Sequence, residues 1–157
     1  GQKDVQTISP GTRLVMQSFL NLKYALEFIF LRWHIRMDWD VEYTDEFAEW
    51  WDELGAKEQV SVSASVDLLG LLGPGLGFPH TSDIKGSRHG NLRELRVRHA
   101  GRPYRVLYAF DPRRCAVLLI GGDKAAHPRW YEVHVPLAEN VYDIHLQTLR
   151  KEARHHG

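Results

Sequence analysis

Cysteine is almost absent from this chain of 157 residues. Cys115 is the only one, so these residues cannot form a disulfide among themselves, which fits a reducing compartment such as the cytoplasm. Several motifs that mark common enzyme classes are also missing, because the sequence contains no HExxH, no CxxC and no glycine-rich phosphate loop. We therefore expect a cytoplasmic protein that holds no metal and no cofactor.

A long uncharged hydrophobic run is missing as well. Residues 14–35 are apolar overall, but a spanning helix requires about 20 mostly uncharged residues, and no small-residue cleavage site follows. The charges that interrupt the segment are Lys23, Glu27 and Arg32. We expect no membrane partner, and we treat residues 1–36 as an N-terminal extension, either helical or foreign to the native protein. The folded domain is then expected to begin near Met37.

The charges of the chain cancel overall but are separated along it. Residues 38–67 carry Lys57 against ten acids, a formal −9, whereas residues 85–114 carry nine Lys or Arg against two acids, a formal +7. A basic segment of this kind favours a polyanionic partner, and nucleic acid fits best.

The first half of the domain is expected to hold one strand and two helices. Alternation of apolar and acidic residues at 39–43 predicts a half-buried strand. Thr44 is suited to cap a helix that ends near Gly55, and a second helix should run from about Lys57 to Gly73. Its expected core-facing stripe consists of Val60, Ala64, Leu68, Leu71 and Leu72.

An irregular connection and three strands follow. Residues 73–91 are rich in Gly, Pro, Ser and His and are expected to form a loop without a core of its own. The segments 92–99, 104–110 and 115–121 are separated by turn sequences. They predict a meander of antiparallel strands.

Helical periodicity returns after residue 126, with a break or restart at Pro136 and one apolar face up to about Lys151. The order of elements predicts a single α+β domain, in which an N-terminal strand and a helical hairpin precede an antiparallel sheet and a C-terminal helix. We place this domain at 37–152 and regard 153–157 as a solvated tail.

Alternation also assigns the two faces of the meander. In its first strand, Leu95 and Val97 should face the core, while Arg96 and Arg98 should lie on the other side. If Arg105 of the next strand joins them, three guanidinium groups converge on one open face. Such groups can clamp a phosphate in bidentate fashion, although arginines on the solvent side of a sheet serve equally well in ordinary ion pairs.

Two motifs and one lysine on these strands are similar to the pattern of RelE/HigB-type toxins of type II toxin–antitoxin modules, especially the phage-derived HigB-like branch. They are Glu94-Leu95-Arg96, Tyr104-Arg105-Val106-Leu107-Tyr108 and Lys124, with Lys85-Gly86 upstream. The resemblance covers residues 37–125 well and 126–152 loosely. It departs at Gly121-Gly122-Asp123, where many relatives have an aromatic residue and a Lys-Lys pair.

The resemblance implies a small RelE-like domain, related to microbial ribonucleases. It implies a toxin that acts as a ribosome-dependent endoribonuclease, cleaves mRNA without a metal, inhibits translation and arrests growth. The implied partners are the ribosome with its mRNA and a cognate helix-turn-helix antitoxin. Operator DNA would be contacted only through the complex with that antitoxin.

RNA cleavage by attack of the substrate's own 2′-OH needs a proton acceptor, a proton donor and cations that stabilise the phosphate. Arg96 and Arg105 are the expected stabilisers. Lys85 could act as a base, if nearby arginines lower its pKa, or as a phosphate ligand. Lys124 could contact a phosphate, and His127 could transfer a proton near neutral pH. Each of these side chains could equally occupy an ordinary surface or ion-pair position.

Further residues are expected to bind the RNA, and Tyr131 among them could stack on a base or donate a proton. The set is Arg88, His89, Arg98, Arg129 and Tyr131. Two other functions stay open at this point: a toxin of the same scaffold that poisons DNA gyrase, and a non-catalytic regulator that binds nucleic acid through the same basic sheet. The convergent cations favour the nuclease.

Overall fold

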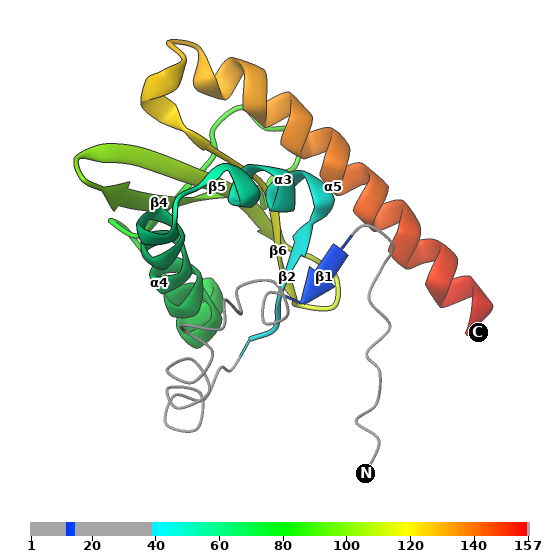
Figure 1. Cartoon of the computed structure of the whole chain (residues 1–157). Helices are drawn as coiled ribbons and strands as arrows, with labels where there is room; N and C mark the ends of the chain where they lie inside the picture. Colours follow the sequence, from blue (N-terminus) through cyan, green and yellow to red (C-terminus); the bar gives the residue numbers. More distant parts are fainter. Residues whose placement is uncertain (1–11, 15–38, 157) are drawn as a thin grey trace.

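A single sheet with helices on both faces makes up the computed structural model, which describes residues 12–14 and 39–156 (Figure 1). The strands are β1 (Thr12–Leu14), β2 (Val41–Thr44), β3 (Thr81–Asp83), β4 (Arg93–His99), β5 (Arg102–Phe110) and β6 (Ala116–Asp123). The helices are α3 (Asp45–Glu53), α4 (Ala56–Leu72) and α5 (Trp130–His155), with short 3-10 helices η1 (Gly73–Gly75) and η2 (Lys124–Ala126).

The sheet has the strand order β1-β2-β6-β5-β4-β3. Strands β4, β5 and β6 form the predicted antiparallel meander, and β2 lies parallel to β6. The α+β fold is thereby confirmed. The expectation of a purely irregular connection at 73–91 was wrong, because this segment contains the strand β3, which pairs with β4. Its three residues are too few to show alternation, and Thr81 is held by a buried hydrogen bond from its hydroxyl to the Glu94 carbonyl (2.8 Å).

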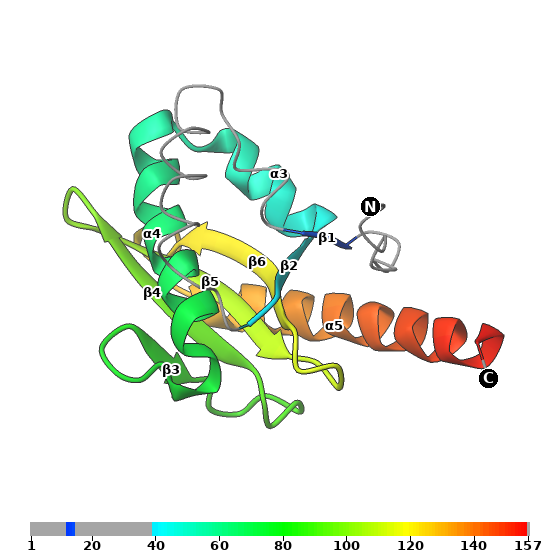
Figure 2. The same ribbon diagram turned by 90° about the horizontal axis from the view of Figure 1, so that it is seen from below.

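Helices α3 and α4 cover one face of the sheet and α5 covers the other (Figure 2). The two faces therefore have separate hydrophobic cores. The core beneath α3 and α4 contains, among others, Phe47, Val62, Val66, Leu95, Val97, Val106 and Leu118. The core beneath α5 contains, among others, Leu107, Ala109, Val117, Leu119, Trp130, Ala138 and Tyr142.

The cap predicted for the first helix is confirmed. Thr44 Oγ1 accepts a hydrogen bond from the Phe47 N–H (3.1 Å), and the same hydroxyl donates to the Leu119 carbonyl (2.7 Å). One side chain therefore fixes both the start of α3 and its attachment to β6. The helix ends at Glu53, just before Gly55, as expected.

The predicted core stripe of α4 was wrong. Val60 and Leu72 are 46% and 47% exposed, whereas Val62, Val66 and Leu69 are buried against the sheet. Apolar residues lie on several sides of this helix, so periodicity alone does not select a face. Packing against the sheet selects the face with the β-branched valines.

Two further expectations were wrong. The acid Glu42 in β2 is buried instead of exposed, because Arg113 binds both of its carboxylate oxygens (3.0 and 2.8 Å). Pro136 does not break α5, which continues to His155 and so includes part of the expected tail. The carbonyl left without its intrahelical partner belongs to Glu132, which is exposed, so water can satisfy it.

The remaining domain assignments stay predictions. None of the helices that the structure describes is long and apolar enough to cross a membrane. The apolar segment 14–35 lies outside the described residues except for Leu14, and so does Met37.

Candidate functional site

Arg96 and Arg105 lie directly opposite each other on the antiparallel strands β4 and β5. Directly opposed side chains have Cβ atoms only about 5 Å apart, and like charges in this arrangement destabilise the sheet. Both arginines line a hollow of about 220 Å³ together with Pro79, Val97 and Arg98. The three predicted arginines therefore line one hollow, but Arg105 is buried beside Glu94 and does not lie on an open face as expected. The arrangement places a concentration of positive charge where an anion would relieve the repulsion.

Arg105 is held in place but keeps hydrogen-bonding capacity. The residue is 6% exposed, and its Nη1 donates to the carbonyl of Tyr104 (3.0 Å). Its Nε lies 3.7 Å from Glu94 Oε2 and makes no hydrogen bond within the described part of the chain. Because this Nε is buried, a ligand in the hollow could meet Arg105 only through its Nη groups.

Glu94 anchors this group of side chains and was not among the residues predicted for the site. Its carboxylate accepts hydrogen bonds from Ser82 Oγ (2.7 Å) and from the Tyr131 hydroxyl (2.6 Å), in addition to the ion pair with Arg105. Alternation had placed Glu94 on the same face as Arg96, and this was the available signal. Alternation does not reveal that Glu94 binds Tyr131, because this contact forms only when α5 packs over β4.

Tyr131 connects the arginines to Lys124. Burial and the hydrogen bond to Glu94 raise the pKa of the Tyr131 phenol, while Arg105 opposes this increase. The phenol therefore remains protonated at neutral pH. The Lys124 ammonium lies 5.3 Å from the centre of the Tyr131 ring, a cation–π contact. Contacts through Glu94 thus link two further predicted residues, Tyr131 and Lys124, to Arg105.

Two glycines in β6 explain how α5 reaches this position. A Cβ on Gly122 would lie 2.6 Å from Trp130 Nε1, and a Cβ on Gly121 would lie 2.0 Å from Trp50 Cε3. The absence of side chains thus lets a tryptophan approach the sheet on each face. Because Tyr131 follows Trp130, this close packing sets the phenol beside Glu94.

The structure does not bring Arg88 and His89 to the arginine hollow. Arg88 binds the Asp143 carboxylate and also donates its backbone N–H to Glu139 (2.8 Å), and His89 Nε2 lies 2.7 Å from Asp143 Oδ1. The hydrogen bonds from Arg88 and then from His89 lower the pKa of Asp143 to about 2. These two residues attach the loop after β3 to α5.

The other predicted residues are exposed and lie apart. Lys85 is exposed in the loop after β3, and no contact within the described residues links it to the arginines. His127 lies between η2 and α5, where its Nδ1 accepts from the Arg129 N–H (3.0 Å). Arg129 Nε lies 3.7 Å from Glu132 on the helix surface. Arg98 is also exposed but lines the hollow.

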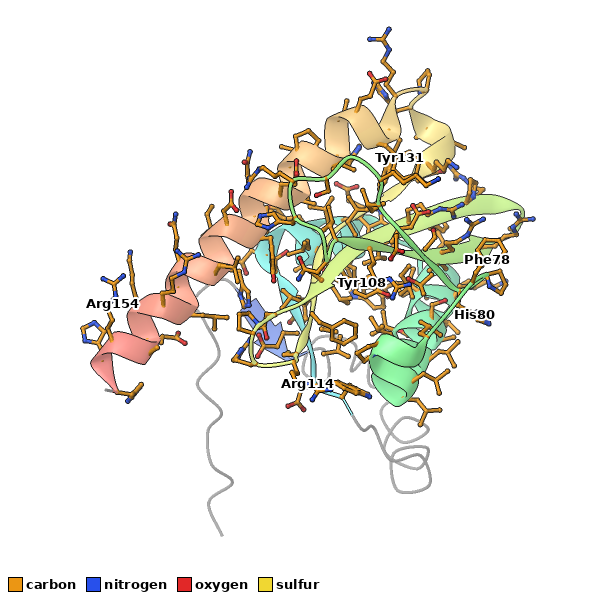
Figure 3. All side chains as sticks on the ribbon, turned by 180° about the vertical axis from the view of Figure 1, so that it is seen from behind. Phe78, His80, Tyr108, Arg114, Tyr131 and Arg154 are labelled. Atoms are coloured by element: carbon orange, nitrogen blue, oxygen red, sulfur yellow. The ribbon has the colours of Figure 1, made fainter. Side chains whose placement is uncertain are left out.

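Figure 3 shows that Tyr131 and Phe78 lie on the same side of the molecule, distant from the C-terminal end of α5. A larger hollow of about 520 Å³ lies at that end, lined among others by Asp40, Glu42 and Glu152. Arg113 and His156 also line it, but Arg113 is bound to Glu42 and Asp111, so among the described residues this hollow offers no set of free guanidinium groups to a phosphate. Within residues 39–156, no group of three or more His, Cys, Asp or Glu side chains is placed to hold a metal ion.

The sequence matches a known family and two curated relatives. The family described as "Phage derived protein Gp49-like (DUF891)" matches residues 49–143. The chain is 43% identical over 91 residues to "Putative toxin HigB3" of Mycobacterium tuberculosis, covering 57% of this chain and 78% of the relative. It is 36% identical over 104 residues to "Putative toxin HigB2" of the same organism.

The second alignment covers 65% of this chain and 52% of the relative, so the match spans about half of that protein's length. No solved structure gives a significant match. The family match spans β4, β5, β6, Lys124 and Tyr131. It also spans the loop that contains Pro79, and it therefore includes every element that forms the arginine hollow. The chain therefore belongs to the phage-derived Gp49-like family and is a HigB-like toxin of a toxin–antitoxin module.

Proposed function

We propose that this toxin is a ribosome-dependent endoribonuclease that cleaves mRNA in the cytoplasm and thereby inhibits translation. The observation that supports the proposal most strongly is the direct pairing of Arg96 with Arg105 in a hollow that Arg98 also lines. A sheet that only needed stability would not oppose two like charges on neighbouring strands. A phosphate group is the ligand that this geometry fits.

In the proposed reaction, the 2′-OH of the RNA gives up its proton as its oxygen attacks the adjacent phosphorus. The bond from phosphorus to the 5′-oxygen of the next nucleotide breaks, and that oxygen takes up a proton. Lys85, as a base, and His127 are the residues predicted for these proton transfers.

Arg96 and Arg105 stabilise the negative charge that builds on the phosphate oxygens. Lys124 contributes further positive charge beside Tyr131. Because the pKa of Tyr131 is raised, its phenol stays protonated and serves as a neutral hydrogen-bond partner and not as a base.

A cognate antitoxin is the expected protein partner, because HigB-like toxins belong to two-component modules. We propose that it carries a helix-turn-helix and that operator DNA is contacted only in the complex with it. Lys85, His127, Arg88, His89 and Arg129 stay predictions as site residues, and the structure gives Arg88 and His89 a second role in bracing the loop to α5.

The test is inducible expression of the chain in a bacterium, with and without its antitoxin, followed by primer extension on a translated reporter mRNA. We expect growth arrest that the antitoxin relieves, and new 5′ ends inside translated codons. A matched reporter without a ribosome-binding site should stay intact. Growth arrest with intact mRNA and damaged chromosomal DNA would contradict the proposal and favour a gyrase poison.

A further inference from the structure

Phe78 is an exposed aromatic ring beside the arginine hollow, in the loop between η1 and β3. The residue is 75% exposed, the highest value among the large exposed apolar residues of the described chain. The Arg96 guanidinium lies over the ring, 5.1 Å from its centre. Arg96 therefore covers one face of the ring, and the exposed remainder offers a flat apolar surface next to a charged one.

The loop holds Phe78 in a fixed position at the rim of the hollow. Pro79, the next residue, is one of the residues that line it. The backbone N–H of Arg96 donates to the carbonyl of His80 (2.8 Å), so the loop is tied to β4 two residues beyond the ring. Figure 3 shows Phe78 and His80 together at this edge of the molecule. The ring is thus part of the same surface as the three arginines.

The aromatic ring of Phe78 and the neighbouring arginines together indicate what kind of ligand this surface binds. A phosphate in the hollow would receive hydrogen bonds from the guanidinium groups of the arginines that line it. An aromatic ring a few ångströms from that phosphate suits a nucleobase, because every base has a flat surface that stacks on aromatic side chains. An apolar peptide would gain from the ring but would leave the guanidinium groups without partners.

We propose that Phe78 is the base-stacking subsite of this toxin, where a nucleobase of single-stranded RNA stacks on the ring while its phosphate lies among Arg96, Arg98 and Arg105. The base, the Phe78 ring and the Arg96 guanidinium then form one stack. This assignment rests on the proposed function in taking RNA as the ligand. It adds a residue outside the strands that would influence which nucleotide the toxin prefers next to the bound phosphate.

The experiment measures binding of a short fluorescent single-stranded RNA, with 2′-O-methyl groups that prevent cleavage, to the full chain and its variants. Phe78→Leu should weaken binding about five- to hundred-fold, the range measured for loss of one stacked base, and Phe78→Trp should restore it. Ile144→Ala is the matched control, because Ile144 is 61% exposed on α5, away from the hollow, and should leave binding unchanged.

The salt dependence separates stacking from charge. Phe78→Leu should leave the slope of log affinity against log salt unchanged, because it removes no phosphate contact, whereas Arg98→Ala should reduce the slope by about one unit. If Phe78→Leu binds the RNA as tightly as the wild type, the proposal is refuted. It is also refuted if that variant loses the antitoxin while keeping the RNA, since Phe78 would then be a protein contact.

The failure of this inference can be told apart from failure of the proposed function. Phe78-dependent RNA binding by a wild-type chain that cuts no mRNA would overturn the nuclease proposal and leave the stacking subsite intact. The opposite result would be mRNA cleavage by the wild-type chain together with unchanged RNA binding and unchanged base preference at the cut in Phe78→Leu. It would overturn the stacking subsite and leave the nuclease proposal intact.

Discussion

Replacing Arg105 with Gln tests the site and the fold at once. The substitution removes a side chain that is buried beside Glu94, with Nε and Oε2 3.7 Å apart. At an effective dielectric constant of about 20, two unit charges at this distance attract by roughly 4 kcal/mol, and the desolvation of both groups offsets part of that. Loss of one partner of a buried pair costs about 3–5 kcal/mol in other proteins.

Two features of the structure reduce the expected cost. After the substitution, Glu94 keeps its hydrogen bonds from Ser82 and Tyr131, so its charge is not left without donors. The repulsion between Arg96 and the directly opposed Arg105 is also relieved. We therefore expect a loss of about 2–3 kcal/mol in the free energy of unfolding, or about 8–12 °C in Tm for a domain of this size.

Urea and thermal unfolding of a double-mutant cycle measure this effect. The cycle comprises Arg105→Gln, Glu94→Gln and the double variant. Because each single variant leaves a buried charge without its partner, the double variant should be more stable than additivity predicts by about 1–3 kcal/mol. In parallel, Arg105→Gln should slow mRNA cleavage by about 100-fold or more. Additive stabilities would refute the ion pair, and full cleavage activity would refute a role of Arg105 at the phosphate.

Three further predictions follow from other contacts. Tyr131→Phe removes a donor to the buried carboxylate and should cost about 1–2 kcal/mol in thermal unfolding, while RNA affinity is kept because the ring remains. Asp67 has a pKa raised by burial to about 6, against an ordinary 3.8, so the stability that its neutral form provides is lost as the pH rises through 6. Asp67→Asn should therefore stabilise the fold by up to about 3 kcal/mol at pH 8 and by less than about 1 kcal/mol at pH 4, and equal gains at both pH values in urea unfolding would contradict this. Gly122→Ala should cost about 1–3 kcal/mol through its clash with Trp130, whereas Gly77→Ala, whose Cβ would meet nothing within 4 Å, should be neutral when the two melts are compared.

The strands of the meander and their faces could be predicted from the sequence because their signals are local. Period-two alternation identifies β4 and β5, and turn residues separate them. The register was not predicted, because the expected turn at 100–103 would place Arg96 opposite Leu107. The observed turn has only two residues, since β5 begins at Arg102, and Arg96 therefore lies opposite Arg105. The cap at Thr44 is local in the same sense.

The parts that were missed depend on contacts between distant segments. The contacts of Tyr131 with Glu94 and of Arg88 with Asp143 join α5 to residues 37 and 55 positions away. No periodicity within either segment encodes such a pair. The buried face of α4 was likewise set by the sheet against which it packs, because the helix itself has apolar residues on more than one side.

The rate of mRNA cleavage on programmed ribosomes by Arg96→Ala, compared with Arg150→Ala, tests the central claim most directly. Arg96 is only half-buried and Arg150 is exposed on α5, so neither variant should lower the Tm. We predict that Arg96→Ala cleaves at least about 100-fold more slowly and that Arg150→Ala cleaves at the wild-type rate. Equal rates for the two variants would contradict the claim that opposed guanidinium groups on β4 and β5 hold the scissile phosphate.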